Sequence, residues 1–472
     1  LKVLASDLNP VAVVTMKAAI EYPLKFGPDL QQDIDKWVKW VGDEAEKRLA
    51  EFFPSLPGEK VQNYLWAHTV VCPSCESIVP LSPNWWLSKT SNYGGKGQAR
   101  KVTSDWYAVR PIPNPEQKRV NFELVKGKKG KGNTIVCENS EEYDPETVIT
   151  ISRGVGKCLN CDSVIEDEVI KSQAQSIGLE QQLYAVAYRK GDSSLEFRIP
   201  TEIDFKGVKE TASFLEAKRT ELELSGLIPV QEIPSNTHRG SDMYLYGIYK
   251  WMQLFNTRQL LTLSTYAATI RDAREVIWSK YEDERTEALV TYLSLIFDRC
   301  ADSNCKLAHW DASRVSVKAG SAQHSLSLMW NYPEGIGAGD LWHKCADVFA
   351  SEYKTLCSLL GEDSQNIFTA EKQDLKSVQI CAASADALHH ILDGSLLAVV
   401  TDPPYYDAIR YSEISDFFYV WLRANLLDVF PDLFSNELTD KDNEAIANPG
   451  RFRNMGASPE DLANQDYEAK MA

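Results

Sequence analysis

The sequence predicts an α/β fold: an open sheet with parallel strands, interrupted by a β-rich module that carries paired cysteines and by a helical segment. Two apolar runs, one near each end of the chain, lead directly into an aspartate, which is typical of strands that end at the ligand-binding edge of such a sheet. Two C-x-x-C pairs and a long stretch with apolar residues at helical spacing lie between them. A chain of 472 residues, 44% of them hydrophobic, can bury a core and form two or three domains.

The first segment, residues 1–62, begins with a strand from Val3 to Ser6 and an exit turn, Asp7-Leu8-Asn9-Pro10. A helix is predicted from Val11 to about Glu21, and an amphipathic helix from about Gln31 to Phe53. The N-terminus shows no signal-peptide pattern. Because the chain opens on leucine inside a strand, we expect that the N-terminal part of a longer protein precedes it.

The second segment, residues 63–170, is rich in glycine, proline and lysine and holds both cysteine pairs, which predicts an inserted β-rich module. The third segment, residues 171–350, predicts two strands, at 184–189 and 195–200, followed by a helix. A largely helical pattern then runs to residue 304, with Asn256 as a helix N-cap.

The fourth segment, residues 351–472, contains the end of a helix predicted from Gly339 to Leu360. Two strands follow, Ser377–Ala382 and the apolar run Leu396–Thr401, which is short enough to be a buried strand. An aromatic-rich helix is predicted from about Glu413 to Val429.

Four of the ten cysteines form two pairs, Cys72-Pro73-Ser74-Cys75 and Cys158-Leu159-Asn160-Cys161. Each pair can hold one edge of a tetrahedral ion, so together they predict a structural Zn²⁺ site with all four positions filled. Redox-active or unligated thiols are the alternatives. We expect the other six cysteines to be small buried hydrophobes, and His68 to be a surface or capping residue.

Cysteine usage and charge restrict the class of protein. Metal-bound thiolates in a large acidic chain fit the reducing cytoplasm, and no apolar run reaches the ~18 residues of a membrane helix. We therefore expect a cytoplasmic protein without a membrane partner. The net charge of -17 argues mildly against nucleic-acid binding.

A local basic stretch qualifies that argument. From Lys89 to Lys131 there are eleven Lys or Arg residues against three acids. Aromatic residues interleaved with basic ones suit phosphate contact and base stacking. The alternatives are a solvated basic loop and aromatics that form the core of the module. The aromatics concerned are Trp85, Trp86, Tyr93, Trp106 and Tyr107.

The most informative motif, Asp402-Pro403-Pro404-Tyr405, follows the apolar run Leu396–Thr401. The Asp402 carboxylate and the Pro403 carbonyl can each accept a hydrogen bond from an NH₂ group, and Tyr405 can stack on a flipped base. Pro404 stiffens the backbone. This arrangement suits methyl transfer to the exocyclic amino group of a base, where positioning and electrostatics supply most of the acceleration. The alternative is a strand that ends in a Pro-Pro turn with a capping aspartate.

The motif resembles the catalytic signature of amino-methyltransferases. Together with the stretch from Tyr411 to Leu422, it resembles the large bacterial and archaeal adenine-specific DNA methylases that contain a zinc ribbon. The opening from Leu4 to Ala12 is similar to that family's second motif, and the middle third is only loosely similar around Tyr246–Leu261. The resemblance implies a partial Rossmann-like methyltransferase sheet with an inserted zinc ribbon and a helical insertion.

The resemblance also implies the cofactor S-adenosyl-L-methionine. Asp7 would bind its ribose hydroxyls, since an acid just past a strand end can accept two hydrogen bonds from a diol. Asn9 would shape the turn, and Asp386 would contact the cofactor's adenine amino group. Helix capping by Asp7 and an ordinary loop position for Asp386 are the alternatives. The family's Gly-rich methionine-binding loop is expected before residue 1 and its later strands after residue 472.

The implied activity is methylation of adenine N6 in DNA, in restriction, phage defence or epigenetic marking, with defence-system proteins as possible partners. The third segment is then a candidate for target recognition. Methylation of cytosine N4 is the nearest alternative, and aspartate at position 402 favours adenine by resemblance. RNA or protein-amide methylation is associated with asparagine there. A zinc-dependent DNA-binding protein with an inactive methylase remnant is an alternative of another class.

Overall fold

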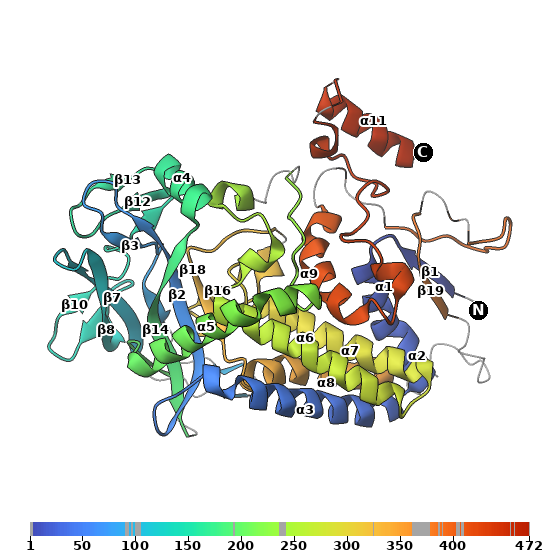
Figure 1. The fold of residues 1–472 in the computed structure, drawn as a ribbon, viewed down its shortest axis with the longest axis horizontal. Coiled ribbons are helices and arrows are strands. Elements are labelled where there is room, and N and C mark those ends of the chain that lie inside the picture. Colours follow the sequence, from blue (N-terminus) through green and yellow to red (C-terminus); the bar gives the residue numbers. More distant parts are fainter. Residues whose placement is uncertain are drawn as a thin grey trace.

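A computed structural model shows a mixed α/β protein with several sheets and a set of long helices (Figure 1). In this view the β-rich part and a two-stranded parallel sheet, formed by residues 3–7 and 378–382, lie on opposite sides of the long helices. Within the described ranges, no helix combines the length and the hydrophobicity needed to cross a membrane. The structure describes residues 3–89, 94–95, 98–99, 105–191, 194–235, 242–323, 325–360, 378–385, 388, 390–402, 406, 410–453, 455–456 and 458–471.

Two segments that are far apart in the sequence meet in a parallel pair of strands. β1 (Val3–Asp7) and β19 (Val378–Ala382) run side by side in register, with Asp7 opposite Ala382. The chain then turns into α1 (Pro10–Met16), which continues through a π-helical turn, Lys17–Glu21, and α2 (Tyr22–Phe26). Both predicted strands and the predicted first helix are confirmed.

The strand predicted at Leu396–Thr401 is wrong. The backbone there is irregular, and the side chains of Leu397 and Val400 are 96% and 95% exposed. A strand needs a neighbour that takes up its backbone hydrogen bonds. In the part of the chain that the structure describes, β1 and β19 pair only with each other, and this apolar run joins neither of their open edges.

A central antiparallel sheet joins distant parts of the sequence. Its order is β15 (Glu196–Arg198), β14 (Glu180–Lys190), β2 (Glu59–Val71) and β18 (Asn331–Gly335), and β3 (Ile78–Pro80) also pairs with β2. The two strands predicted near residues 184 and 195 are therefore confirmed. One sheet combines strands that the sequence assigned to different segments.

The β-rich part between β2 and β14 contains two further sheets. The larger has the order β10 (Glu142–Tyr143), β9 (Ile135–Cys137), β8 (Arg119–Lys129), β7 (Trp106–Asn114) and β4 (Trp86–Ser88). The smaller consists of β11 (Ile151–Ser152), β12 (Val155–Lys157) and β13 (Val164–Ile165). Two hairpins complete the strands: β5 (Gly94–Gly95) with β6 (Gln98–Ala99), and β16 (His309–Asp311) with β17 (Ser316–Lys318).

The tryptophans of this part form its core. Trp86 and Trp106 meet edge to face, with ring centroids 5.5 Å apart, and Trp85 meets Tyr184 of β14 at the same distance. All of these side chains are buried, as is Tyr107. The interpretation of the aromatics as core residues is therefore confirmed for these positions, whereas Tyr93 lies outside the described residues.

Long helices pack together and share the largest hydrophobic core (Figure 1). α6 (Thr257–Trp278) contacts α3 (Asp29–Leu49) and α7 (Asp283–Ser303), and α7 also contacts α8 (Asp340–Leu360) and α9 (Tyr411–Leu426). α7 carries buried residues on every face, as expected of a helix enclosed by others. The other helices are α4 (Asp167–Ile177), α5 (Glu202–Leu224), α10 (Pro431–Phe434) and α11 (Pro459–Met471), with 3₁₀ turns at Ala50–Phe52, Asp242–Tyr246, Trp251–Leu254, Gly320–Gln323 and Pro449–Phe452.

The predicted N-cap at Asn256 is confirmed. Its side chain accepts a hydrogen bond from Gln259 N at 2.8 Å, and Gln259 Oε1 accepts one from Asn256 N at 2.9 Å. This reciprocal capping box satisfies two backbone donors at the buried start of α6.

A buried ion pair connects α6 to the central sheet. Glu334 of β18 has no exposed surface, and Arg258 of α6 is 2% exposed. Glu334 Oε1 accepts a hydrogen bond from Arg258 Nε, and Oε2 accepts from Trp66 Nε1 at 2.6 Å and from Asn256 Nδ2 at 3.0 Å. The Arg258 guanidinium also lies 4.0 Å from the ring centroid of Tyr64. A single carboxylate therefore ties β18 and β2 to α6.

His68 of β2 is buried rather than on the surface, so the prediction of a surface or capping residue is wrong. Its side chain is 1% exposed, and its ring lies 5.5 Å from that of Tyr332. Burial, with a smaller contribution from the charge of Lys306, lowers the pKa of His68 to about 3. β2 is buried on both faces here, so the imidazole occupies a core position.

We expect Glu334→Ala to destabilise the protein by ~3–5 kcal/mol, because it leaves the buried Arg258 without its counter-charge. The thermal midpoint, followed by circular dichroism, measures the effect. Glu210→Ala is the matched control: it breaks the exposed pair with Lys206, where the side chains are 44% and 67% exposed, and should leave the midpoint unchanged. Equal midpoints for both variants would contradict a central role for Glu334.

The depressed pKa of His68 predicts acid sensitivity. An unfolded histidine binds a proton below pH ~6.5, whereas the folded one binds it only near pH 3, so stability is lost as the pH falls through this window, at ~1.4 kcal/mol per pH unit. Thermal midpoints measured from pH 7 to 5 should therefore fall less steeply for His68→Phe than for the wild type. His390→Gln, at an exposed position, should keep the wild-type slope.

Candidate functional site

Two short hairpins bring the four paired cysteines together. In each, the amide of the first cysteine donates a hydrogen bond to a serine carbonyl five residues later, at 2.8 Å in Cys72–Ser77 and 2.9 Å in Cys158–Ser163. The residue after the second cysteine has a left-handed backbone in both hairpins, with φ of 61° and 58°. Both hairpins thus make the same tight turn, which points both sulfurs of each pair to one side. The left-handed residues are Glu76 and Asp162.

The four sulfurs have the spacing of a tetrahedral metal site. Cys72 Sγ lies 3.7 Å from Cys161 Sγ, and Cys75 Sγ lies 3.6 Å from Cys158 Sγ. All four lie within 4.8 Å of one another. Thiolates at ~2.3 Å from a central ion would be ~3.8 Å apart. The cysteines are therefore close enough to bind one metal ion, and all four positions around it would be filled.

The surroundings of the cluster differ between its two faces. Cys158 is buried, and burial raises the pKa of its thiol to about 12. Cys161 is exposed, and hydrogen bonding with Ser163, 3.3 Å away, lowers its pKa to about 6. Since thiolates are the metal-binding form, the exposed face is where proton loss and metal entry are easiest.

The basic stretch from Lys89 to Lys131 lies in the same β-rich part of the molecule as the four cysteines. Lys126 and Lys128, on one face of β8, form ion pairs with Asp105. Lys89 pairs with Glu146 at 3.0 Å and lies 4.6 Å over the Trp86 ring. These contacts neutralise part of the local charge, while residues 90–93, 96–97 and 100–104 lie outside the described residues.

The second candidate site lies at the carboxyl ends of β1 and β19. Asp7 is exposed, and its Oδ1 accepts a hydrogen bond from Asn9 N at 2.8 Å. Asn9, rather than Asp7, caps α1, since its Oδ1 accepts from Val11 N at 3.0 Å. Asn9 Nδ2 also donates to Ser415 Oγ of α9 at 2.7 Å. The structure thereby joins the Asp7 turn to the helix that follows the Asp-Pro-Pro-Tyr motif.

The motif itself is only partly described. Asp402 is exposed and has an irregular backbone, whereas Pro403, Pro404 and Tyr405 lie outside the described residues, as does Asp386. The next described residue, Tyr406, has a left-handed backbone with φ of 51°, and its ring lies 5.3 Å from that of Tyr467 on α11.

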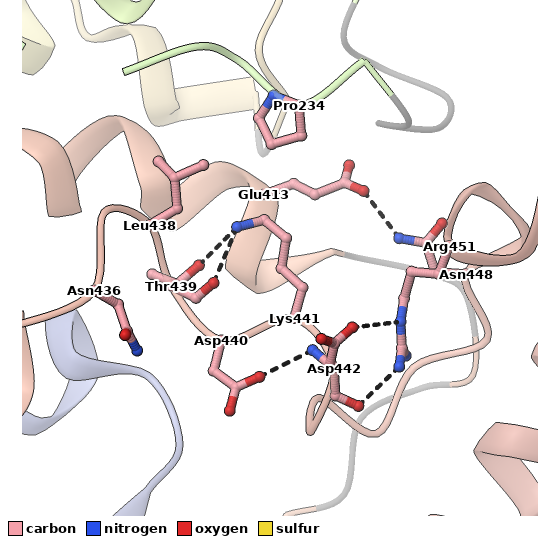
Figure 2. A pocket seen from close by; sticks show the side chains of 10 residues that line it. All are labelled: Pro234, Glu413, Asn436, Leu438, Thr439, Asp440, Lys441, Asp442, Asn448 and Arg451. Atoms are coloured by element: carbon pink, nitrogen blue, oxygen red, sulfur yellow. Dashed lines mark hydrogen bonds and ion pairs between the residues drawn. The ribbon is translucent and has the colours of Figure 1, made fainter. Parts of the chain in front are cut away.

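A third site was not predicted from the sequence. A pocket of about 410 Å³ lies between the start of α9 and the loop that follows α10 (Figure 2). Glu413, predicted only as the start of a helix, lies in its wall with 8% of its surface exposed. No sequence motif marks this site, because its residues come from α9, a later loop and Pro234. The lining residues are Pro234, Glu413, Asn436, Leu438, Thr439, Asp440, Lys441, Asp442, Asn448 and Arg451.

The serines of the cysteine hairpins could have been found from the sequence. Both hairpins read C-x-x-C, then an acid, then serine, ending at Ser77 and Ser163. Of the other six cysteines, Cys300, Cys305 and Cys345 are buried as expected, and the remaining three are partly buried.

Comparison of the chain with protein-family models, with curated proteins and with solved structures finds no match.

Proposed function

We propose that the chain is part of an S-adenosylmethionine-dependent DNA methyltransferase that methylates the N6 amino group of adenine. The observation that carries this proposal is the hydrogen bond from Asn9 to Ser415, which spans 406 positions. It supports the proposal because it brings together the two stretches, around Asp7 and after Asp402, on which the resemblance to adenine-specific methylases depends. The parallel pairing of β1 with β19 supports it as well.

The proposed roles follow from the chemistry of each residue. The exposed Asp7 carboxylate would hold the cofactor's ribose diol, with Asn9 fixing the turn. Asp402 would accept a hydrogen bond from the adenine amino group and orient its nitrogen, with Tyr405 stacking on the base. Asp386 would contact the cofactor's adenine. The cofactor would supply the methyl group from its sulfonium.

We further propose that the four-cysteine cluster holds structural zinc. Tetrahedral coordination by four thiolates is typical of Zn²⁺ and leaves no open position for catalysis. The ion would join hairpins that are 86 positions apart in sequence, from Cys72 to Cys158, and so fix the β-rich part on β2. Lysines of β8, in the same β-rich part as the cluster, would contact DNA phosphates.

A second candidate function has a specific observation in its favour. The run from Leu396 to Val400, which precedes Asp402, is exposed and forms no strand, so Asp402 does not follow a buried strand end. This favours a DNA-binding protein whose zinc module acts without methyl transfer. Methylation of cytosine N4 uses the same strand-end geometry and stays an alternative to adenine N6. The assay below separates all three.

The zinc proposal predicts one zinc per chain, because four thiolates surround a single position. Elemental analysis by mass spectrometry of the purified protein measures it. Cys72→Ser combined with Cys161→Ser should abolish zinc and destabilise the β-rich part. Cys137→Ser, in the same part of the fold but outside the cluster, is the control and should retain the metal. Full zinc content in the double variant would refute this assignment.

The methyltransferase proposal predicts that Asp402→Ala abolishes methyl transfer while cofactor affinity stays within a few-fold, because Asp402 acts on the base. Transfer of labelled methyl groups to DNA, with nucleoside analysis of the product, measures activity and distinguishes N6-methyladenine from N4-methylcytosine. Asp7→Ala should instead weaken cofactor binding. Asp393→Ala, an exposed aspartate in the same segment, should change neither. Cofactor binding without methyl transfer by the wild type would favour the DNA-binding alternative.

A further inference from the structure

The pocket beside α9 has the size of a small-molecule site. Its volume of about 410 Å³ lies within the ~300–1,000 Å³ range of ligand pockets. Pro234 and Leu438 supply apolar surface, and the rest of the lining is polar (Figure 2). Such a lining suits a flat ligand with hydrogen-bonding edges.

Both cations of the lining are already neutralised. Lys441 Nζ lies 2.6 Å from Asp416 Oδ2 and donates to the Thr439 carbonyl at 3.1 Å. Arg451 Nη1 donates to Asp466 Oδ2 at 2.9 Å. Asp416 and Asp466 lie outside the lining, but Arg451 Nε also lies 3.9 Å from Oδ1 of the lining residue Asp442 and so engages that carboxylate (Figure 2).

The carboxyl groups of the pocket are engaged to different degrees. Three line it, those of Glu413, Asp440 and Asp442, together with the amides of Asn436 and Asn448. Asp440 already accepts hydrogen bonds from Asp442 N, Asn443 N and Asn443 Nδ2, and Asp442 is paired with Arg451. An anionic group would be repelled, whereas an amino group would find its acceptor in Glu413.

Glu413 is the buried member of this set and is held in place. It is 8% exposed, and its Oε1 accepts a hydrogen bond from Asn448 Nδ2 at 3.0 Å (Figure 2). Asn448 is oriented in turn, since its Oδ1 accepts from Gly450 N at 3.0 Å. One bond leaves a carboxyl group with further hydrogen-bonding capacity, so Glu413 can still bind a ligand.

The charge of Glu413 is sensitive to pH. Burial, with a smaller contribution from the charge of Glu444, raises the pKa of its carboxyl to about 7 against the opposing charges of Arg410 and Lys441 and the hydrogen bond from Asn448. The acid form offers an O–H donor next to a carbonyl acceptor, whereas the ionised form offers acceptors only. The other charged groups around the pocket are Asp440, Asp442 and Arg451.

We propose that this pocket binds a nucleobase through an amidine edge, that is, an exocyclic NH₂ beside an unprotonated ring nitrogen, as in adenine or cytosine. The NH₂ donates to the carbonyl oxygen of Glu413, the Glu413 O–H donates to the ring nitrogen, and Pro234 and Leu438 contact the base faces. That the base belongs to DNA rests on the proposed function; binding of the base itself does not.

Calorimetric titration of the full chain with single nucleosides tests the proposal. Deoxyadenosine or deoxycytidine should bind at pH 6 and bind roughly tenfold or more weakly at pH 8.5, because ionised Glu413 has no proton for the ring nitrogen. Thymidine, which lacks an amino group, should not bind. Deoxyguanosine, whose edge carries two donors, should not gain from the acid form, and a guanosine affinity that rises with pH would overturn the proposal.

Substitutions of Glu413 sharpen the test. Glu413→Gln keeps a donor beside an acceptor at every pH, so binding should persist and lose its pH dependence, which also shows that the variant folds. Glu413→Leu should abolish binding at both pH values. Glu437→Gln, a neighbouring exposed acid outside the lining, should behave as the wild type. Binding that is unaffected by Glu413→Leu would sink the assignment.

Two further variants separate this pocket from the proposed methyltransferase site. Asp7→Ala and Asp402→Ala should leave the Glu413-dependent nucleoside binding unchanged, even though the first weakens cofactor binding and the second abolishes methyl transfer. If the wild type never transfers methyl groups but binds nucleosides with the Glu413 dependence, the proposed function fails and the pocket stands. If nucleoside binding is lost with Asp7→Ala instead, the nucleosides occupy the cofactor site and the pocket proposal fails.

Discussion

The carboxylate of Glu334 is the point on which the arrangement of the sheet and the helices depends. Moving a carboxylate out of water costs several kcal/mol, so it must be compensated where it lies. Arg258, Trp66 and Asn256 all donate to its two oxygens, Trp66 from β2 and the other two from the start of α6. Any packing that separated β18, β2 and α6 would leave a buried charge without partners. A buried pair of this kind is weak evidence for net stability, but it discriminates strongly against other arrangements.

The hydrogen-bond network around Glu334 is connected to both candidate sites, to one through β2 and to the other through α6. β2 carries Trp66 and ends one residue before Cys72, so the same strand that contacts Glu334 positions the first cysteine of the four-cysteine cluster. In the other direction, Asn256 caps α6, and the adjacent Phe255 packs against Trp421 of α9 with ring centroids 5.4 Å apart. α9 then reaches the Asp7 turn. The first cysteine hairpin and the Asp7 turn are thus both anchored on one rigid frame.

The elements that the sequence predicted well are those whose signal is local. Helical spacing, the N-cap at Asn256 and the C-x-x-C pairs depend on residues within a few positions of one another, and each has its predicted form. The misses are long-range. Leu396–Thr401 has the composition of a buried strand, but a strand exists only if a neighbour accepts it. His68 is polar by type and buried by its place on β2. The Glu413 pocket was not predictable, because its wall is assembled from residues about 180 positions apart, from Pro234 to Glu413.

α9 shows why the strand-end site and the pocket belong to one structural unit. Ser415 points to Asn9, Glu413 and Asp416 point to the loop that follows α10, and Trp421 packs against Phe255 and Phe297. These contacts occupy different faces of one helix, and the face that carries Trp421 packs in the core. A ligand in the pocket and a ligand at the Asp7 turn would therefore be held at a distance set by the helix itself, since a buried helix cannot tilt toward one face without disturbing its packing on another. Geometry of this kind allows a base and a second ligand to be presented together without a mobile connection between them.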